Sequence, residues 1–350
     1  MGCSEQDRPF PARLPAGPRN AITDVAGVTV GHCTLSRGPV QTGVTAVLPH
    51  PGSLFLEKVP AGCAVFNGFG KATGLVQVSE LGVLETPIIL TNTLSVGTAY
   101  TALVRRALAE DPAIGVTTGT VNPVVCECND GDLNDIRGLH VTEAHVFSAL
   151  DSAGPVVDEG AVGAGRGMVC YGCKGGIGTA SRLAEVPGVR FCVGCLVLTN
   201  YGRAGDLRLA GRRPFPDAVG RPDKGSAIVL LATDAPLSHR QLNRLSRRAV
   251  AGLCRSGSVI GNGSGELALS FSTAYRVPHR AQSPFLDLRL LRDEHLDPLF
   301  TAAAEAVEDA VYSSLLHAET VTGVRGHTVL SLRDRLSGAG NEGQEEHIII

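Results

Sequence analysis

Residues 258–273 read Ser-Val-Ile-Gly-Asn-Gly-Ser-Gly-Glu-Leu-Ala-Leu-Ser-Phe-Ser-Thr and place Ser264 between two glycines at the head of an alternating apolar strand. If the chain breaks between Gly263 and Ser264, the new α-amine, with an unperturbed pKa of about 8, can act as the general base for its own hydroxyl. Gly263 suits such a break, because a residue without a Cβ tolerates the strained backbone that an N-to-O acyl shift requires. The stretch therefore predicts a serine nucleophile that self-cleavage would expose.

The same residues support a second interpretation. Asn262 and Gly263 form an Asn-Gly pair between two β-like runs, which is the strongest short signal for a tight hairpin turn. On spacing alone, a simple turn is the commoner explanation, so the choice between turn and nucleophile depends on the rest of the chain.

Composition limits the class of protein. The chain has 350 residues, 43% of them hydrophobic, and a formal net charge of −3. We predict one domain spanning residues 1–350 with a large core. A weakly acidic chain has no field that attracts nucleic acid or an anionic membrane, so we expect a small molecule or peptide as substrate.

Location and redox state follow from similar observations. No apolar run approaches the ~20 residues that span a bilayer, and the N-terminus lacks the pattern of a secretory signal. We therefore expect a cytoplasmic protein without membrane contact, with its ten cysteines reduced.

Four cysteines have the spacing of a zinc site. Cys170 and Cys173 form one C-x-x-C pair, and Cys192 and Cys195 form another, as in many four-cysteine centres. Their flanks are apolar, however, and favour buried strands in which cysteine acts as a small hydrophobic residue. We predict no metal and no cofactor, with zinc as the alternative.

Several elements can be placed from periodicity. Residues 226–234 form a continuous apolar run typical of a strand buried on both faces. Ser238 and Gln241 form a capping box that opens a helix, and residues 297–317 predict a second amphipathic helix. Residues 203–224 are expected to form a surface loop, and 335–350 a partly disordered tail. The apolar face of the first helix would consist of Leu242, Leu245, Ala249 and Leu253.

Blocks along nearly all of residues 18–327 resemble the L-aminopeptidase/D-esterase family, which includes the β-peptidyl aminopeptidases. Two examples are Asp-Gly-Asp-Leu-Asn-Asp-Ile at 130–136 and Gly-Asn-Gly-Ser-Gly at 261–265. Members of the family are self-cleaving N-terminal-nucleophile hydrolases. Further blocks lie at 20–32, 87–97, 163–168, 174–182 and 233–237.

The resemblance carries expectations for fold and activity. It implies a four-layer αββα sandwich of the type shared with ornithine acetyltransferase, cleaved into an α-chain of residues 1–263 and a β-chain of residues 264–350. The enzyme would be an aminopeptidase or amidase that removes N-terminal residues from small peptides, amides or esters. We also expect a homo-oligomer.

Three further residues are candidates for the site. Asn200 ends the apolar run 195–200, where a rigid amide N–H can stabilise an oxyanion, and the family uses an asparagine at such a strand end. Asn92, at another strand end, could orient substrate. The family's Ser-x-Glu pair corresponds to Arg292 and Glu294 here, so Glu294 is the expected supporting acid and Glu319 its rival.

Two other functions stay open. One is an acyltransferase of the ornithine-acetyltransferase type, which normally uses a threonine nucleophile where this chain has Ser264. The other is an unprocessed, non-catalytic homologue, which the replacement of the family's serine by Arg292 permits.

Overall fold

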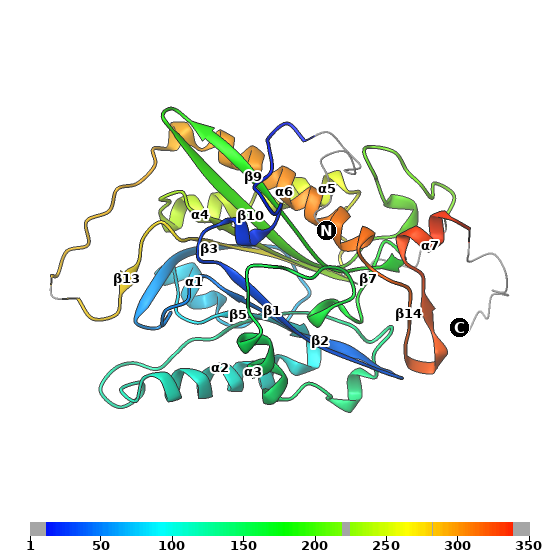
Figure 1. Cartoon of the computed structure of the whole chain (residues 1–350), viewed down its shortest axis with the longest axis horizontal. Coiled ribbons are helices and arrows are strands. Elements are labelled where there is room, and N and C mark those ends of the chain that lie inside the picture. The colour runs from blue at the N-terminus through cyan, green and yellow to red at the C-terminus, as the bar shows by residue number, and fades with distance from the viewer. Residues whose placement is uncertain (1–11, 219–224, 282, 339–350) are drawn as a thin grey trace.

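Two β-sheets packed face to face, with helices on both outer sides, make up the molecule (Figure 1). The structure is a computed structural model that describes residues 12–218, 225–281 and 283–338. The first sheet has four strands in the order β1-β2-β5-β6, with β5 and β6 parallel and the other pairs antiparallel. Its strands are β1 (Thr29–Arg37), β2 (Val40–Leu48), β5 (Ile88–Asn92) and β6 (Val124–Cys128).

The second sheet has seven strands and contains the strand that Ser264 precedes. Its order is β13-β3-β12-β11-β10-β9, with β4 paired to β3. β11 and β12 are parallel, and the other pairs are antiparallel. The strands are β3 (Glu57–Gly68), β4 (Val83–Leu84), β9 (Gly176–Val186), β10 (Val189–Asn200), β11 (Ser226–Thr233), β12 (Gly265–Ser272) and β13 (Val277–Pro278).

Helices cover the two outer faces. The first sheet is covered by α2 (Val96–Glu110) and α3 (Glu143–Asp151), and the second by α4 (His239–Ser246), α5 (Ala249–Arg255) and α6 (Asp297–Leu316). Shorter elements are α1 (Leu75–Leu81), α7 (Leu332–Leu336), the hairpin β7 (Val169–Cys170) and β8 (Cys173–Lys174), and the hairpin β14 (Val321–Thr322) and β15 (Thr328–Val329).

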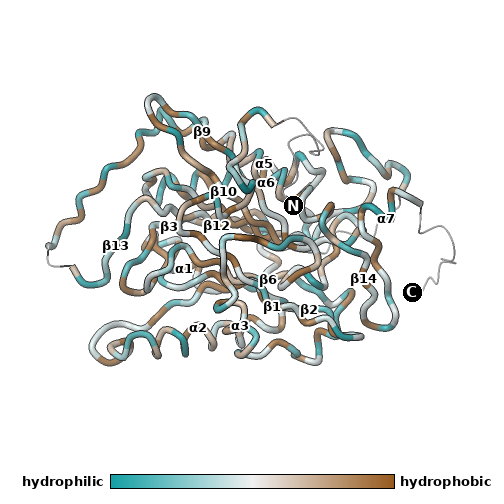
Figure 2. The backbone as a smooth tube through the Cα atoms, in the orientation of Figure 1, coloured by the Kyte–Doolittle hydropathy of each residue, from teal (hydrophilic) through white to brown (hydrophobic). Residues whose placement is uncertain are grey.

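Three apolar clusters lie between these layers. Successive side chains of a strand point to opposite faces of its sheet. In β10, Leu196 and Leu198 therefore enter the core between the sheets, while Cys195 and Val197 pack toward α6. A third cluster joins the first sheet to α2 and α3. The apolar colouring of the inner strands in Figure 2 follows this arrangement. The layers run helix, sheet, sheet, helix, and this confirms the predicted four-layer αββα sandwich.

The strand and the two helices that were predicted from hydrophobic periodicity are present in the structure, with one difference in the first helix. The predicted strand is β11, and α6 covers the second predicted helix. The Ser238 capping box is present, with Ser238 N donating to Gln241 Oε1 at 2.9 Å. The first helix, however, is interrupted after α4 by a tight turn in which Arg248 N donates to Leu245 O at 2.9 Å. Its four predicted apolar residues are all fully buried.

Cys170 and Cys173 are buried but lie on either side of the tight turn between β7 and β8, where a buried strand was predicted. Cys192 and Cys195 lie within β10, as their flanks predicted. Cys192 enters the core between the sheets, whereas Cys195 faces the helices on the other side of β10. The two thiols of this pair therefore point away from one another. Among the described residues, no group of three or more histidine, cysteine or acidic side chains could hold a metal ion.

Other sequence expectations fall partly outside the described residues. In the predicted loop 203–224, residues 203–218 contain one 3-10 turn at Ala204–Asp206, and 219–224 lie outside. In the predicted tail 335–350, Arg335 and Leu336 end α7, and 339–350 lie outside. None of the described helices is both long enough and apolar enough to cross a bilayer.

Candidate active site

Ser264 lies immediately before β12 and follows a tight turn. Its backbone N–H donates to Gly261 O at 3.0 Å, which closes a turn with Asn262 and Gly263 at the central positions. The predicted Asn-Gly turn is thus present, and it presents the Gly263–Ser264 peptide bond at its end. The two interpretations of residues 261–264, a tight turn and a serine nucleophile, are therefore compatible, because the turn holds the Gly263–Ser264 peptide bond.

The segment before this bond carries backbone strain. Ile260 has a φ of 52°, in the left-handed region that β-branched residues strongly avoid. Such a conformation costs about 1–3 kcal/mol and persists only where the surroundings enforce it. A break after Gly263 would free this segment and release that cost.

Asn67 holds the turn in place from the neighbouring strand β3. Its Nδ2 donates to the carbonyl oxygens of Gly261 and Asn262, both at 3.1 Å, and also to that of Ser264. The three carbonyls flank Gly263 on both sides. Asn67 was not predicted, because it lies 197 residues from Ser264 in the sequence and only the β3–β12 pairing brings it there.

Glu266 is the side chain that contacts the serine hydroxyl. Ser264 Oγ donates to Glu266 Oε1, and both residues are fully buried. Residues two apart in an extended segment point to the same side, which explains how one strand end supplies both groups. In the sequence, the only sign of this contact is that a glutamate follows the serine by two positions in the predicted strand. The alternation of polar and apolar residues gives no indication that this glutamate is buried.

Glu127 is a second buried carboxylate at the site. It accepts a hydrogen bond from Lys71 N at 2.9 Å and another from the Thr93 hydroxyl. Gly70 separates it from the strand of the serine: a Cβ on Gly70 would lie 3.7 Å from Glu127 Oε1 and 3.9 Å from Gly265 Cα. Among the described residues, no basic side chain forms an ion pair with Glu127.

The Cys128 thiol lies within the electrostatic influence of both carboxylates. Burial raises its pKa well above the ordinary value, and the negative charges of Glu127 and Glu266 raise it further. The thiol therefore stays protonated and does not compete with Ser264 as a nucleophile.

Asn200 lies at the same edge of the second sheet as the start of β12, two strands away from it. It pairs with Ser226 of β11, which in turn pairs with Gly265. Two strand spacings place Asn200 about 10 Å from Gly265. Its Oδ1 accepts from Val169 N at 2.9 Å, and its Nδ2 donates to Asn129 O at 3.0 Å. One N–H of the amide is left for another acceptor.

Asn92 ends β5 and caps the turn that follows it. Its Oδ1 accepts from Leu94 N and Ser95 N, both at 3.1 Å, and its Nδ2 donates to the Thr42 hydroxyl at 2.8 Å. These bonds cap the turn that precedes α2. Asn92 thus contributes to the site through its neighbour Thr93, which donates to Glu127.

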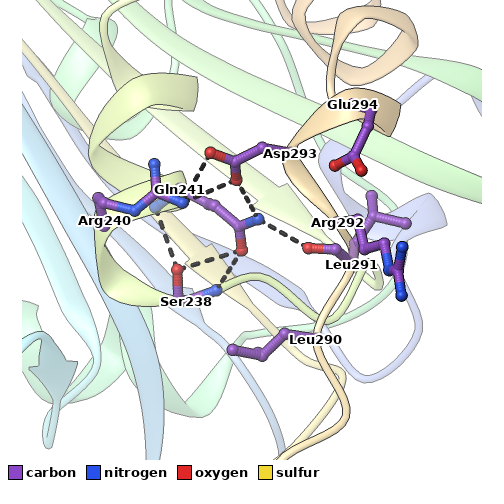
Figure 3. A pocket seen from close by; sticks show the side chains of 8 residues that line it. All are labelled: Ser238, Arg240, Gln241, Leu290, Leu291, Arg292, Asp293 and Glu294. Atoms are coloured by element: carbon purple, nitrogen blue, oxygen red, sulfur yellow. Dashed lines mark hydrogen bonds and ion pairs between the residues drawn. The ribbon is translucent and has the colours of Figure 1, made fainter.

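The structure does not bring Glu294 to the serine. Leu291 N donates to Pro236 O at 2.9 Å, beyond the end of β11 at which Thr233 pairs with Ser272. Ser264 lies before the other end of β12, roughly 23 Å away along an eight-residue strand. Figure 3 shows Glu294 instead at the edge of a hollow of about 430 Å³, on the far side of Asp293 from Arg240. In this structure, Glu294 therefore lies too far from Ser264 to contact it.

Glu319 also lies elsewhere. Its carboxylate is exposed and forms an ion pair with Arg166. Neither predicted glutamate contacts Ser264, whereas the Glu266 carboxylate accepts a hydrogen bond from its hydroxyl.

The loop after β6 contains an acid with a perturbed pKa. Burial raises the pKa of Asp130 to about 6, although a hydrogen bond from Asn134 Nδ2, at 3.1 Å, opposes the shift. The folded chain thus binds a proton at Asp130 up to about pH 6, whereas the unfolded chain releases it near pH 3.8. Between these values the folded state binds more protons, so its stability falls as the pH rises.

We therefore expect Asp130→Asn to stabilise the protein at pH 7, by about 2–3 kcal/mol, because the buried charge is absent. Urea unfolding between pH 4 and pH 7.5 should show a decline in the native chain that the variant lacks. Asp151→Asn, at a largely exposed position, serves as the control and should follow the native profile. A variant less stable than the native chain at pH 7 would contradict this account.

Comparisons with known proteins agree with this fold. The chain matches Peptidase family S58 over residues 20–329. It is similar to the beta-peptidyl aminopeptidase BapA of Sphingosinicella microcystinivorans, with 40% identity over 347 residues that cover 90% of this chain and 86% of that protein.

Solved structures are similar over almost the whole chain. A Burkholderia sp. beta-aminopeptidase matches with a TM-score of 0.88 and 41% identity, covering 96% of this chain and 98% of that one. The L-aminopeptidase D-Ala-esterase/amidase of Ochrobactrum anthropi, a prototype for the serine aminopeptidases, matches with a TM-score of 0.88 and 39% identity, covering 95% and 96%. That structure is a variant of the Ntn-hydrolase fold.

Fold and site thus define a protein of the Ntn-hydrolase fold class with a serine at the head of a central strand. The chain belongs to peptidase family S58, which confirms the resemblance found in its motifs. It is an aminopeptidase, and therefore a hydrolase.

Proposed function

We propose that the chain cleaves itself between Gly263 and Ser264 and then uses Ser264 as an N-terminal nucleophile. The observation that carries the proposal is the hydrogen bond from Ser264 Oγ to the buried Glu266 carboxylate, at the end of a turn that Asn67 holds by its carbonyls. A serine hydroxyl that donates a hydrogen bond to a carboxylate has a general base positioned to accept the hydroxyl proton.

The cleavage step follows from these contacts. Glu266 takes the proton of Ser264 Oγ, and Oγ forms a bond to the carbonyl carbon of Gly263. The bond between that carbon and Ser264 N then breaks, and the nitrogen receives the proton from Glu266. The product is an ester of Gly263 on Oγ, which water hydrolyses to leave a Gly263 carboxylate and a free Ser264 with both its amine and its hydroxyl.

The freed amine then serves in turnover. It accepts the proton of Oγ while Oγ attacks the carbonyl of the N-terminal residue of a substrate, and it returns the proton to the leaving amine. Water releases the acyl group in a second step. Asn200 is the proposed donor to the oxyanion, through the amide N–H that Asn129 does not occupy.

Glu127 supplies a site for the substrate's own amine. It is a buried carboxylate whose two described hydrogen bonds come from neutral donors, and Gly70, which has no side chain, lies between it and β12. A substrate ammonium would provide the missing positive charge. We therefore propose peptides, amides or esters with a small, unblocked N-terminal residue as substrates, including β- or D-residues, as the names of the relatives suggest.

Glu127→Gln is expected to lower kcat/KM for an amino-acid amide by about 10²-fold, mainly through KM, because the variant loses charge pairing with the ammonium. Self-cleavage should proceed normally. The comparison substrate is the N-acetylated form of the same amide, on which the substitution should have no effect. Glu143→Gln, on the outer helix α3, is the matched control. An unchanged KM would remove Glu127 from substrate binding.

A mass measurement tests the proposed function directly. After purification and prolonged incubation, the chain of 36.3 kDa should appear as two fragments, one of which begins at Ser264. Hydrolysis of amino-acid amides should increase in parallel with the cleaved fraction. A chain that stays intact, or that is active while intact, would overturn the proposal.

We also propose a cytoplasmic location. The nine cysteines among the described residues are free thiols, which is the state expected in a reducing compartment.

A further inference from the structure

A hollow of about 610 Å³ lies beside β3, close to the self-cleavage turn. We call it the β3 hollow. Its walls come from β3, from α1 and from the segment that joins α4 to α5, and Ile260, just before the turn, lies on one side. Most of its lining is apolar, and Val65, Phe66 and Val250 contribute to it. Of the described residues that line it, only Arg247 is charged.

The edge of β3 is open where it borders this hollow. Ala61 N donates to Gly82 O at 2.8 Å and Cys63 N donates to Asn243 Oδ1 at 2.8 Å, so both N–H groups point away from β12. Backbone groups alternate in direction along an antiparallel strand, so the Val65 N–H points the same way. Outside the pairing of β3 with β12, no described residue accepts a hydrogen bond from Val65 N. An exposed strand edge of this kind can pair with an extended peptide.

The β3 hollow lies in line with the reacting groups. From the hollow at residues 63–66, β3 runs to Gly68, which pairs with the residue that follows Ser264. The chain then continues to Lys71, whose N–H donates to Glu127 Oε1 at 2.9 Å. Along β3, the proposed ammonium site and the hollow are therefore on opposite sides of Ser264. A substrate with its amine at Glu127 and its carbonyl at Ser264 would extend its leaving part toward the hollow.

The separation suits a short peptide. Gly68 and Val65 are three residues apart, which is about 10 Å along a strand, and an extended peptide spans that distance with about three residues. A peptide that runs from Ser264 toward Val65 is antiparallel to β3, and its carbonyl can accept from the Val65 N–H. The Val65 side chain is 57% exposed, so it offers apolar surface to the side chains of such a peptide.

Arg247 supplies a charge at the rim of the β3 hollow. Its side chain is exposed, and among the described residues no acidic side chain forms an ion pair with it. Two neighbouring arginines do have such partners: Arg244 pairs with Asp293 at 3.0 Å, and Arg255 pairs with Glu308 at 3.4 Å. A guanidinium beside an apolar hollow is suited to bind a carboxylate. The C-terminus of a short peptide carries that group.

We propose that the β3 hollow binds the leaving part of a peptide substrate. This part is about two or three residues long, has apolar side chains, pairs with the β3 edge at Val65 and ends in a carboxylate that Arg247 binds. The inference rests on the proposed function, because it takes Ser264 as the nucleophile. It makes short peptides with a free C-terminus bind more tightly than simple amino-acid amides.

Three substrates with the same N-terminal residue test the proposal: alaninamide, Ala-Leu-Leu and the C-terminal amide of Ala-Leu-Leu. For the native chain, KM should be at least about tenfold lower for both tripeptides than for alaninamide. Arg247→Gln should raise KM for Ala-Leu-Leu about tenfold and leave both amides unchanged, because only Ala-Leu-Leu has a carboxylate. Arg244→Gln is the matched control and should change none of the three values. Equal KM values for alaninamide and the tripeptide amide, or equal effects of Arg247→Gln on Ala-Leu-Leu and its amide, would overturn the proposal.

Cys63 provides a second measurement that needs no turnover. Its thiol is half-buried in the β3 hollow, whereas the Cys254 thiol is exposed. Acetyl-Leu-Leu, which has a free carboxylate and a blocked amine, should slow alkylation of Cys63 by iodoacetamide at least about threefold and leave Cys254 unaffected. Arg247→Gln should remove this protection. Unprotected Cys63 in an active enzyme would overturn the inference alone, whereas protected Cys63 in a chain that hydrolyses none of the substrates would count against the proposed function alone.

Discussion

Ser264→Ala is expected to abolish both self-cleavage and peptide hydrolysis, leaving one species of 36.3 kDa and a rate at least about 10⁴-fold lower. The physical reason is that one oxygen serves both reactions. In the intact chain it is the hydroxyl that donates to Glu266, and after cleavage it is the nucleophile beside its own amine. The measurements are intact mass after incubation and the initial rate on an amino-acid amide.

Two variants make this result specific. Ser258→Ala removes another buried hydroxyl from the same segment, one that accepts from Ile260 N at 3.2 Å, and it should still cleave. Ser264→Thr retains a hydroxyl and should cleave slowly, because the added methyl group enters a fully buried position. Fragments from Ser264→Ala would show that a different nucleophile acts on the chain.

The sequence predicted the fold well where periodicity and local chemistry agree. β11 is buried along its whole length and reads as a continuous apolar run, and α6 carries a regular apolar face. The break between α4 and α5 was missed because the face of Leu242, Leu245, Ala249 and Leu253 continues across it. Side-chain periodicity reports burial and does not report whether each backbone turn is helical.

The site was predictable only in part, for a different reason. Ser264 is marked by its two glycines, which are local features. Asn67 and Glu127 reach the site through strand pairing and through the segment around Gly70 and Lys71, over separations that no local pattern encodes. Glu294 was chosen by its likeness to a short family motif, and two residues of such a motif do not fix a place in the fold.

Glu266 shows how a nearby residue can also be overlooked. A glutamate in an alternating strand normally faces solvent, so the pattern offered no reason to consider Glu266 as part of the site. The pairing of β12 with β3 shifts register between Glu266 and Leu267, and the strand is buried from its first residue. The polar residue therefore points into the protein, beside the serine.

Glu266→Gln is expected to slow self-cleavage by about 10²–10⁴-fold, the usual contribution of a positioned general base, while the chain still folds. Glutamine keeps the shape of the side chain and an oxygen that can accept from Ser264 Oγ, but an amide cannot take up the proton that the hydroxyl must lose. The time course of cleavage is followed by intact mass, and the thermal midpoint of unfolding reports whether the fold is preserved.

Glu294→Gln and Glu319→Gln separate this role from a general effect of losing a carboxylate. Glu294 lies beyond the far end of β12 and Glu319 pairs with Arg166, so both variants should cleave at the native rate. Glu266→Asp retains the acid but shortens it, and should cleave faster than Glu266→Gln and slower than the native chain. If Glu266→Gln cleaves at the native rate while Glu294→Gln does not, the base lies in the segment that the family motif indicated, and the hydrogen bond between Ser264 and Glu266 only positions the hydroxyl.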